Sequence, residues 1–294
     1  QRNGWSILMP LKYAYHPGNA AHSNAIEVAD TMPPAADSLG IQLVELEGAT
    51  SCGAGIIRQA NADLQVVLNA RTLAQAEAMG LDIITPCATT ASTLHEDLNS
   101  LRNDSKLMAK TNDILERNCG LTLTGEVNVH HLLHVIVDEI GIEKLASKVK
   151  NPFGFRIAGY YGPNMQQEGA CGGDDVYDPD YLEQVISAMG GAPVEWDSRT
   201  HSVGVPGIFS EEKTVLKQTA AVLSDAKSEG AELVVSACNL SHLLMDVYQG
   251  KAGKVSGEAT KVPIIHLTEL LAFGFGHYVD RLAQLRTRIK IIGD

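Results

Sequence analysis

The sequence lacks any Cys-x-x-Cys pair, any long apolar run and any excess of positive charge. Without a Cys-x-x-Cys pair, neither a zinc ribbon nor a thioredoxin-type redox motif fits the spacing. No apolar run reaches the roughly 18 residues that would suggest a membrane span. The formal net charge of -12 argues against a nucleic-acid-binding protein, because such proteins carry a basic patch or stripe.

The cysteines are few, odd in number and widely spread, which does not predict a disulfide framework. The apolar stretch after the first residues is too short for a signal peptide, so we expect a protein of the reducing cytoplasm. With 294 residues, 45% hydrophobic and 20% charged, the chain has the composition of a soluble globular protein and length for two domains. The five cysteines are Cys52, Cys87, Cys119, Cys171 and Cys238.

Hydrophobic periodicity predicts an α/β fold with mostly parallel strands, because short apolar runs alternate with helical patterns. In the first half, strands are expected at 13–15, 41–45 and 81–85, and helices at 25–39 and 64–79. Pro33 and Pro34 predict a kink or break in the first helix. In the second half, strands are expected at 156–161, 194–196 and 232–237, and helices at 181–189 and 213–228.

The two halves repeat each other. Gly53 and Gly204 are 151 residues apart, and so are Cys87 and Cys238. Two copies of a βαβ-type unit are the economical interpretation. We therefore expect a first domain at 11–100, a helical connection with a hairpin of helices at 101–151, and a second domain at 152–294.

Three short motifs of the first half are similar to those of the family of heterodisulfide reductase B subunits, whose members carry duplicated cysteine-rich "CCG" domains. The family has a Pro-Gly-Cys turn, a Cys-Cys-Gly loop and a Pro-Cys-x-x-Cys loop at matching spacings. Asn19, Ser51 and Thr90 stand here where the family has cysteine. The motifs are Pro17-Gly18-Asn19, Ser51-Cys52-Gly53 and Pro86-Cys87-Ala88-Thr89-Thr90.

The second half departs further from the family pattern. Pro163, Ser202, Val203 and Ser241 occupy its cysteine places, and Cys238 remains. The spacing still matches, and so does the segment from His266 to Leu271, so the resemblance covers about residues 11–275. Of the motif cysteines, only Cys52, Cys87 and Cys238 are left.

The resemblance implies one unusual iron–sulfur cluster per domain in the family. One cysteine cannot replace a set of about four thiolates, so no cluster is expected in the second domain. In the first domain, Cys52 and Cys87 are expected to lie close together, near Asn19 and Ser51. They could bind a reduced iron–sulfur site or another metal, with His16 and His22 as further ligands. Alternatively, the two thiols are free.

Three histidines near the middle of the chain offer a weaker candidate. His130, His131 and His134 are predicted on one helix, where His130 and His134 have the i, i+4 spacing of paired metal ligands. No carboxylate ligand stands at the matching position. Core or surface histidines are therefore the favoured interpretation.

The resemblance implies a component of a heterodisulfide reductase-like electron-transfer complex, in sulfur or thiol/disulfide metabolism. Its implied partners are an iron–sulfur C-type subunit, a flavin A-type subunit and a second B-type subunit. With degenerate sites, a structural or electron-relay role without catalysis by the chain alone is expected, with membrane association only through partners. Three alternatives stay open: a succinate or fumarate reductase subunit, a stand-alone thiol-dependent enzyme, and a small-molecule-binding protein using the vacated cleft.

Overall fold

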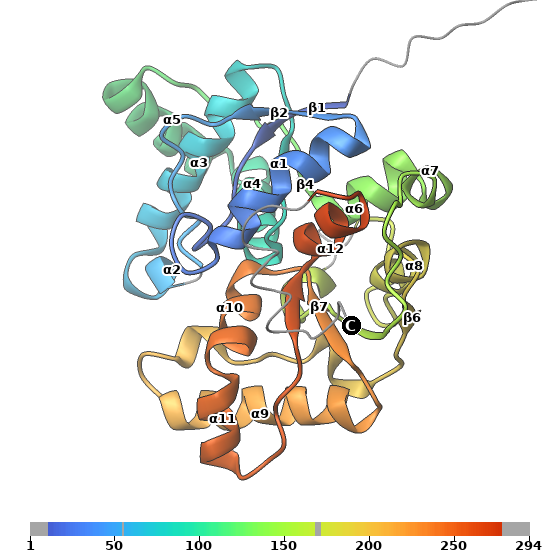
Figure 1. The fold of residues 1–294 in the computed structure, drawn as a ribbon. Helices are drawn as coiled ribbons and strands as arrows, with labels where there is room; N and C mark the ends of the chain where they lie inside the picture. Colours follow the sequence, from blue (N-terminus) through green and yellow to red (C-terminus); the bar gives the residue numbers. More distant parts are fainter. Residues whose placement is uncertain (1–10, 55, 168–171, 278–294) are drawn as a thin grey trace, which may run out of the picture.

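Two four-stranded sheets form the frame of the part of the chain that the structure describes, a computed structural model covering residues 11–54, 56–167 and 172–277. All pairings in both sheets are parallel. The strand orders are β2-β1-β3-β4 and β6-β5-β7-β8, which is one order used twice. The α/β fold and the internal repeat predicted from the sequence are thereby confirmed. Figure 1 shows the two halves, one above the other.

The first lobe comprises residues 11–140. Its elements are β1 (Leu11–Tyr15), α1 (Ile26–Leu39), β2 (Ile41–Glu45), α2 (Ile56–Ala60), α3 (Ala62–Ala78), β3 (Ile83–Thr85), α4 (Ala88–Asn103), α5 (Ser105–Cys119), β4 (Val129–His131), α6 (Leu132–His134) and the π-helical η1 (Val135–Ile140).

A short helix, α7 (Ile142–Ala146), leads into the second lobe at residues 156–277. Among the helices of the described ranges, none combines the length and the apolar character needed to cross a membrane. The second lobe contains β5 (Arg156–Tyr160), η2 (Pro163–Gln166), α8 (Tyr181–Ala188), β6 (Ala192–Pro193), η3 (Asp197–Thr200), η4 (Val205–Gly207), α9 (Glu212–Ser228), β7 (Leu233–Ser236), α10 (Asn239–Val247), α11 (Gln249–Ser256), β8 (Ile264–His266) and α12 (Leu267–Gly274).

Strand periodicity divides the core into three layers. Successive residues of a strand point to opposite faces of the sheet. In β3, Ile83 packs with α3, α4 and α5, whereas Ile84 packs toward the other lobe. In β7, Val234 packs with α9 and α10, whereas Leu233 and Val235 face the first lobe. The central apolar layer therefore lies between the two sheets and belongs to both lobes.

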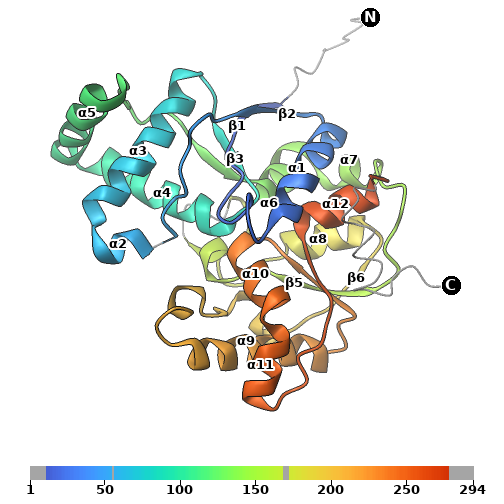
Figure 2. The same cartoon turned by 60° about the vertical axis from the view of Figure 1, so that its left-hand side comes forward.

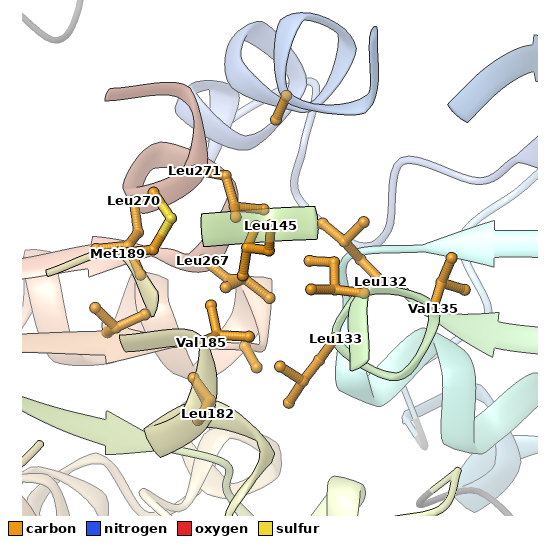
Figure 3. Packing of buried hydrophobic residues seen from close by; sticks show 14 of the residues in the cluster. Leu132, Leu133, Val135, Leu145, Leu182, Val185, Met189, Leu267, Leu270 and Leu271 are labelled. Atoms are coloured by element: carbon orange, nitrogen blue, oxygen red, sulfur yellow. The ribbon is translucent and has the colours of Figure 1, made fainter. Parts of the chain in front are cut away.

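The helices of this central layer are exchanged between the lobes. α12 ends the second lobe but packs against α1 of the first, while α6 and α7 pack against α8 of the second. Both views show α12 beside α1 (Figures 1 and 2). Figure 3 shows where the leucines of these helices meet. They are Leu132, Leu133, Leu145, Leu182, Leu267, Leu270 and Leu271, all buried.

Three local expectations differ from the structure. α1 continues through Pro33 and Pro34, because its buried face packs on the central layer and outweighs the hydrogen bonds that the prolines cannot donate. The stretch 101–151, expected to be helical throughout, contains β4, which completes the first sheet. His130 therefore lies on a strand, so His130 and His134 do not share a helix face.

The turn after β1 carries one glycine that no other residue replaces without strain. Gly18 has φ +87°, in the left-handed region. A Cβ atom at this position would lie 2.5 Å from Cβ of Cys87 and 2.7 Å from Nδ2 of Asn239. Asn239 belongs to the second lobe, so Gly18 marks a place where a turn of one lobe touches the other.

Replacing Gly18 by alanine is expected to lower the free energy of unfolding by about 3 kcal/mol or more, because backbone strain and overpacking add. The matched control is Gly40→Ala, since Gly40 has φ +78° but no atom within 4 Å of the added Cβ. That control should cost about 1 kcal/mol, for strain alone. Urea unfolding of both variants measures the difference; equal costs would contradict the close contact between the lobes.

Candidate functional site

Cys87 and Cys238 occupy equivalent places, each directly before a helix that follows a central strand. Cys87 is the N-cap residue of α4, and Cys238 is that of α10. The N–H of each is held by a hydroxyl two residues earlier, Thr85 at 3.3 Å and Ser236 at 3.3 Å. In α/β folds, functional sites lie at the carboxyl ends of parallel strands. The repeat therefore places Cys87 and Cys238 at two equivalent strand ends, which we call the cysteine corners.

The two corners face each other at the centre of the molecule. The N–H of Ala88 donates to the carbonyl of Ala237 at 3.2 Å, a backbone hydrogen bond between the lobes. Sγ of Cys238 lies 3.2 Å from Oγ1 of Thr89, in the first turn of the helix that Cys87 caps. Both cysteines are buried free thiols. The sites of the two halves thus form one continuous cluster.

The amide of Asn19 organises the first-lobe side of this cluster. Its Nδ2 donates to Sγ of Cys52 at 3.2 Å and to Oγ1 of Thr90 at 3.2 Å, and lies 4.0 Å from Sγ of Cys87. Its Oδ1 accepts from Oγ of Ser51 at 2.5 Å. The structure therefore brings Cys52 and Cys87 to one amide group, beside Ser51 and Thr90. Asn19, at a position where the resemblance implies a cysteine, fills the space between Cys52 and Cys87 with hydrogen bonds.

His16 and His22 do not join these thiols. Nδ1 of the buried His16 accepts from the N–H of Gly18 at 3.0 Å, and its Nε2 lies 3.0 Å from the carbonyl of Thr50. Burial lowers the pKa of His16, so the ring is neutral and donates to Thr50. His22 is exposed, in the wall of a surface cavity of about 640 Å³. In the part of the chain described, no group of three or more His, Cys, Asp or Glu side chains is arranged to hold a metal ion.

On the second-lobe side, a cavity of about 220 Å³ lies between the lobes. Its lining includes all four positions where the resemblance predicts replaced cysteines, namely Pro163, Ser202, Val203 and Ser241. The first lobe contributes Thr89, whose Oγ1 lies 3.2 Å from Sγ of Cys238. The small or hydroxyl-bearing residues thus leave a polar space next to the surroundings of Cys238.

The buried carboxylate of Asp97 holds the loop of Cys52 in place through Asn69. Oδ2 of Asp97 accepts from Nδ2 of Asn69 at 2.6 Å, and the same Nδ2 donates to the carbonyl of Cys52 at 3.2 Å. Arg58, at the rim of the cavity, pairs with Oδ1 of Asp97 at 3.0 Å and with the more exposed Glu96 at 2.5 Å. Arg58 is thus committed to carboxylates of the protein, so its charge is largely neutralised within the rim.

Two equivalent histidines brace the cysteine corners from the central layer. His131 ends β4, and its Nε2 donates to the carbonyl of Ala237 at 2.9 Å while its Nδ1 accepts from the N–H of Leu133 at 3.1 Å. His266 ends β8; its Nδ1 accepts from the N–H of Thr268 at 3.2 Å, and its ring approaches the Pro86 carbonyl. Burial lowers the pKa of His131 to about 4 and that of His266 well below its ordinary value, so both are neutral struts.

A charged cluster lies one helical turn beyond Cys238. Nε2 of His242 lies 2.9 Å from Glu27 of α1 and 4.0 Å from Glu269 of α12. Burial opposes the charge on His242, but the hydrogen bond to Glu27 and the nearby Glu269 together raise its pKa. Burial raises the pKa of Glu269 to about 7. The cluster joins three helices from both lobes behind the thiols.

Several of these residues were not identified from the sequence. Thr89, Asn164 and Asn239 contact the cluster only because the lobes meet, and nothing in their local pattern indicates it. His131 and His266 carried a usable signal, since each follows an apolar strand at the end of its repeat. Of the other cysteines, Cys119 is exposed on α5, and Cys171 lies outside the described residues.

Comparison with known proteins identifies the family of the chain. The model of a family described as "Cysteine-rich domain" (CCG) matches residues 13–95. A relative from Wolinella succinogenes, named 8-methylmenaquinol:fumarate reductase membrane anchor subunit, is 30% identical over 270 residues, or 91% of this chain and 93% of the relative. The chain belongs to the family of heterodisulfide reductase B subunits.

Further matches agree with this assignment. A family member from Methanosarcina acetivorans, named as the B subunit of a ferredoxin/F(420)H(2)-dependent CoB-CoM heterodisulfide reductase, is 26% identical and covers 86% of each chain. The crystal structure of a hypothetical protein from Helicobacter pylori superposes with a TM-score of 0.76 and 15% identity, over 95% of this chain and 52% of that one. The structural match shows the shared fold.

The His242–Glu269 cluster predicts a contribution to stability that falls as pH rises. Glu269 has a folded-state pKa of about 7 against an ordinary value of 4.5, so it favours folding below about 4.5 and loses that contribution through about 7. The raised pKa of His242 acts in the same direction. Between pH 5 and 8, the contribution of Glu269 to the free energy of unfolding should drop by on the order of 3 kcal/mol. The lowered pKa values of His131 and His266 contribute in the opposite direction, so the effect of the cluster is measured as the difference between wild type and a variant.

Urea unfolding across this pH range tests the expectation. Glu269→Gln keeps a hydrogen-bonding side chain but removes the titrating carboxyl group, so the stability of wild type relative to this variant should fall by on the order of 3 kcal/mol from pH 5 to pH 8. Glu258→Gln, at an exposed position, should keep a constant difference from wild type. A difference between wild type and Glu269→Gln that stays constant or grows toward pH 8 would contradict the assignment of the cluster.

Proposed function

We propose that this chain is a structural subunit of a multi-subunit reductase complex and that its two family cluster sites no longer hold clusters. The observation that carries the proposal is a full-length similarity to proteins named as reductase subunits. The relative from Wolinella succinogenes is named as a fumarate reductase subunit and covers 91% of this chain. The relative from Methanosarcina acetivorans is named as a heterodisulfide reductase subunit.

The residues on the first-lobe side do not suit an iron–sulfur cluster. Such clusters are held by thiolates, about four for each cluster. Cys52 and Cys87 are the thiols here, and the Asn19 amide contacts both sulfurs. Asn19 is itself fixed by Ser51 and Thr90, so a cluster would have to displace a closed hydrogen-bond network.

The residues on the second-lobe side suit an iron–sulfur cluster even less than those on the first-lobe side. Pro163 and Val203 carry no atom that binds iron, and Cys238 supplies one sulfur. The cavity at this position is bounded instead by hydroxyl groups, such as those of Ser202 and Ser241. This donor set supports a subunit that keeps the family scaffold and has lost the family cofactor, so we assign no catalytic step to it.

The scaffold remains suited to assembly with other subunits. The lobes share one apolar layer, and buried hydrogen bonds hold the vacated corners in place without a metal. We propose that the partners are an iron–sulfur C-type subunit and a flavin-bearing A-type subunit, with a second B-type subunit supplying the clusters. The higher identity to the fumarate reductase subunit favours a succinate or fumarate reductase as the second candidate.

Copurification and metal analysis test the proposal together. The tagged chain, expressed in its own host, should be recovered with flavin- and iron–sulfur-containing subunits. The same chain purified alone should contain substoichiometric iron and acid-labile sulfide. Cys52→Ser and Cys87→Ser should leave the iron content of the assembled complex unchanged.

Two results would contradict it. Iron and sulfide in cluster stoichiometry in the isolated chain, lost in Cys52→Ser, would restore a cofactor-binding role. A monomer that turns over a disulfide at ordinary enzyme rates without any partner would favour the stand-alone thiol enzyme.

A further inference from the structure

Cys87 and Cys238 lie beside a backbone contact between the two lobes. They cap the helices α4 and α10, whose first residues are linked by the backbone hydrogen bond from Ala88 to Ala237 at 3.2 Å. Across the same contact, Sγ of Cys238 lies 3.2 Å from Oγ1 of Thr89, two residues after Cys87. A disulfide needs Cα atoms closer than about 7 Å, and here the two backbones are in direct contact beside both cysteines.

The surroundings of Cys238 favour a thiolate. Nδ2 of Asn164 donates to Oγ1 of Thr89 at 2.8 Å, which leaves the Thr89 hydroxyl hydrogen for Sγ of Cys238 at 3.2 Å. The backbone N–H groups of Ser241 and Thr89 also point at this sulfur. The hydrogen bond from Cys87, followed by these donors, lowers the pKa of Cys238 well below its usual value.

Cys87 has the complementary character. Burial raises the pKa of its thiol well above the usual value, so it keeps its proton beside Cys238. A low-pKa thiolate beside a second thiol is the arrangement in which oxidation at one sulfur is resolved by the other. Cys52 differs, because its sulfur is engaged by the Asn19 amide rather than by another thiol.

The cavity between the lobes lies next to the surroundings of Cys238. It measures about 220 Å³, and its lining includes Thr89, whose Oγ1 lies 3.2 Å from this sulfur, and Asn164, which donates to the same hydroxyl. Hydroxyl and amide groups suit a small polar molecule. Cys238 itself is 1% exposed, so only a water-sized reagent can approach it without moving the loops.

We propose that Cys87 and Cys238 form a peroxide-reactive pair that closes into a disulfide joining the two lobes. This rests on the proposed function in one respect, because the thiols must be free of a cluster. The oxidant is hydrogen peroxide or a similarly small hydroperoxide. The Cys238 thiolate attacks one peroxide oxygen, the O–O bond breaks, and the leaving hydroxide takes up a proton as water.

The second step closes the bridge. The sulfur of Cys87 attacks the sulfur of the Cys238 sulfenic acid, the S–O bond breaks, and hydroxide leaves as water with the Cys87 proton. Two thiols and one peroxide become one disulfide and two water molecules. Two electrons pass from the sulfurs to the peroxide, and the lobes become covalently linked.

The test uses the full chain, reduced, assayed for iron and treated with one equivalent of hydrogen peroxide. Free thiols are then alkylated in denaturant, and the protein is mapped by non-reducing peptide mass spectrometry. We expect the loss of two of the five thiols and one cross-linked peptide that joins Cys87 to Cys238. Cys119→Ser, at the exposed cysteine on α5, is the matched control and should give the same cross-link.

Two variants separate the steps. Cys87→Ala should stop the reaction at a sulfenic acid on Cys238, trapped by dimedone. Thr89→Val removes one hydroxyl donor and should slow oxidation by about tenfold, the effect of losing one hydrogen bond to a charged sulfur.

Three outcomes overturn the proposal: a cross-link that joins Cys52 to Cys87, survival of all buried thiols, or oxidation of Cys238 to a sulfinic acid without a bridge. Wild-type mapping decides among these even if a variant fails to fold. The iron assay separates this failure from that of the proposed function. Stoichiometric iron would contradict the proposed function. Iron-free protein that forms no disulfide would contradict this inference alone.

Discussion

The hydrogen bond from the backbone of Ala88 to that of Ala237 is the contact on which the centre of this molecule depends. It sets the ends of β3 and β7 against each other and thereby places two cysteines, one from each repeat, in one buried cluster. The neighbouring groups are arranged around it. His131 braces the Ala237 carbonyl, and Asn239 reaches from α10 to the carbonyls of Pro17 and Asn19 at 3.1 and 3.0 Å.

The elements of this fold could be read from the sequence because they depend on local pattern. Apolar runs at strand spacing and glycine-terminated helices locate β1, β3, β5, β7 and most of the longer helices, and the offset of 151 residues reveals the repeat. Local pattern misled where packing decided the outcome. Pro33 and Pro34 suggested a break, but the apolar face of α1 is covered by α12, a helix from the far end of the chain.

The candidate site was predictable only within each half. Spacing placed Asn19, Ser51, Cys52 and Cys87 in the first half and Cys238 in the second. A repeat offset shows that two units are alike, but it does not show how they face each other. No sequence signal therefore indicated that Thr89 and Asn164 lie around Cys238, or that Cys87 and Cys238 flank one backbone contact between the lobes. His16 was considered as a ligand for its position, whereas its two ring nitrogens serve the backbone of the turn.

The exchange of helices between the lobes also bears on how far the two halves can differ. α12 covers α1 of the opposite repeat, and α6 with α7 covers α8, so each half lends the other its last helix. A single repeat of this kind would expose its apolar face and would need a second copy related by two-fold symmetry to bury it. In one chain the two repeats bury this face for each other without having to be identical. The halves can therefore carry different residues at equivalent places, as Cys52 and Val203 do.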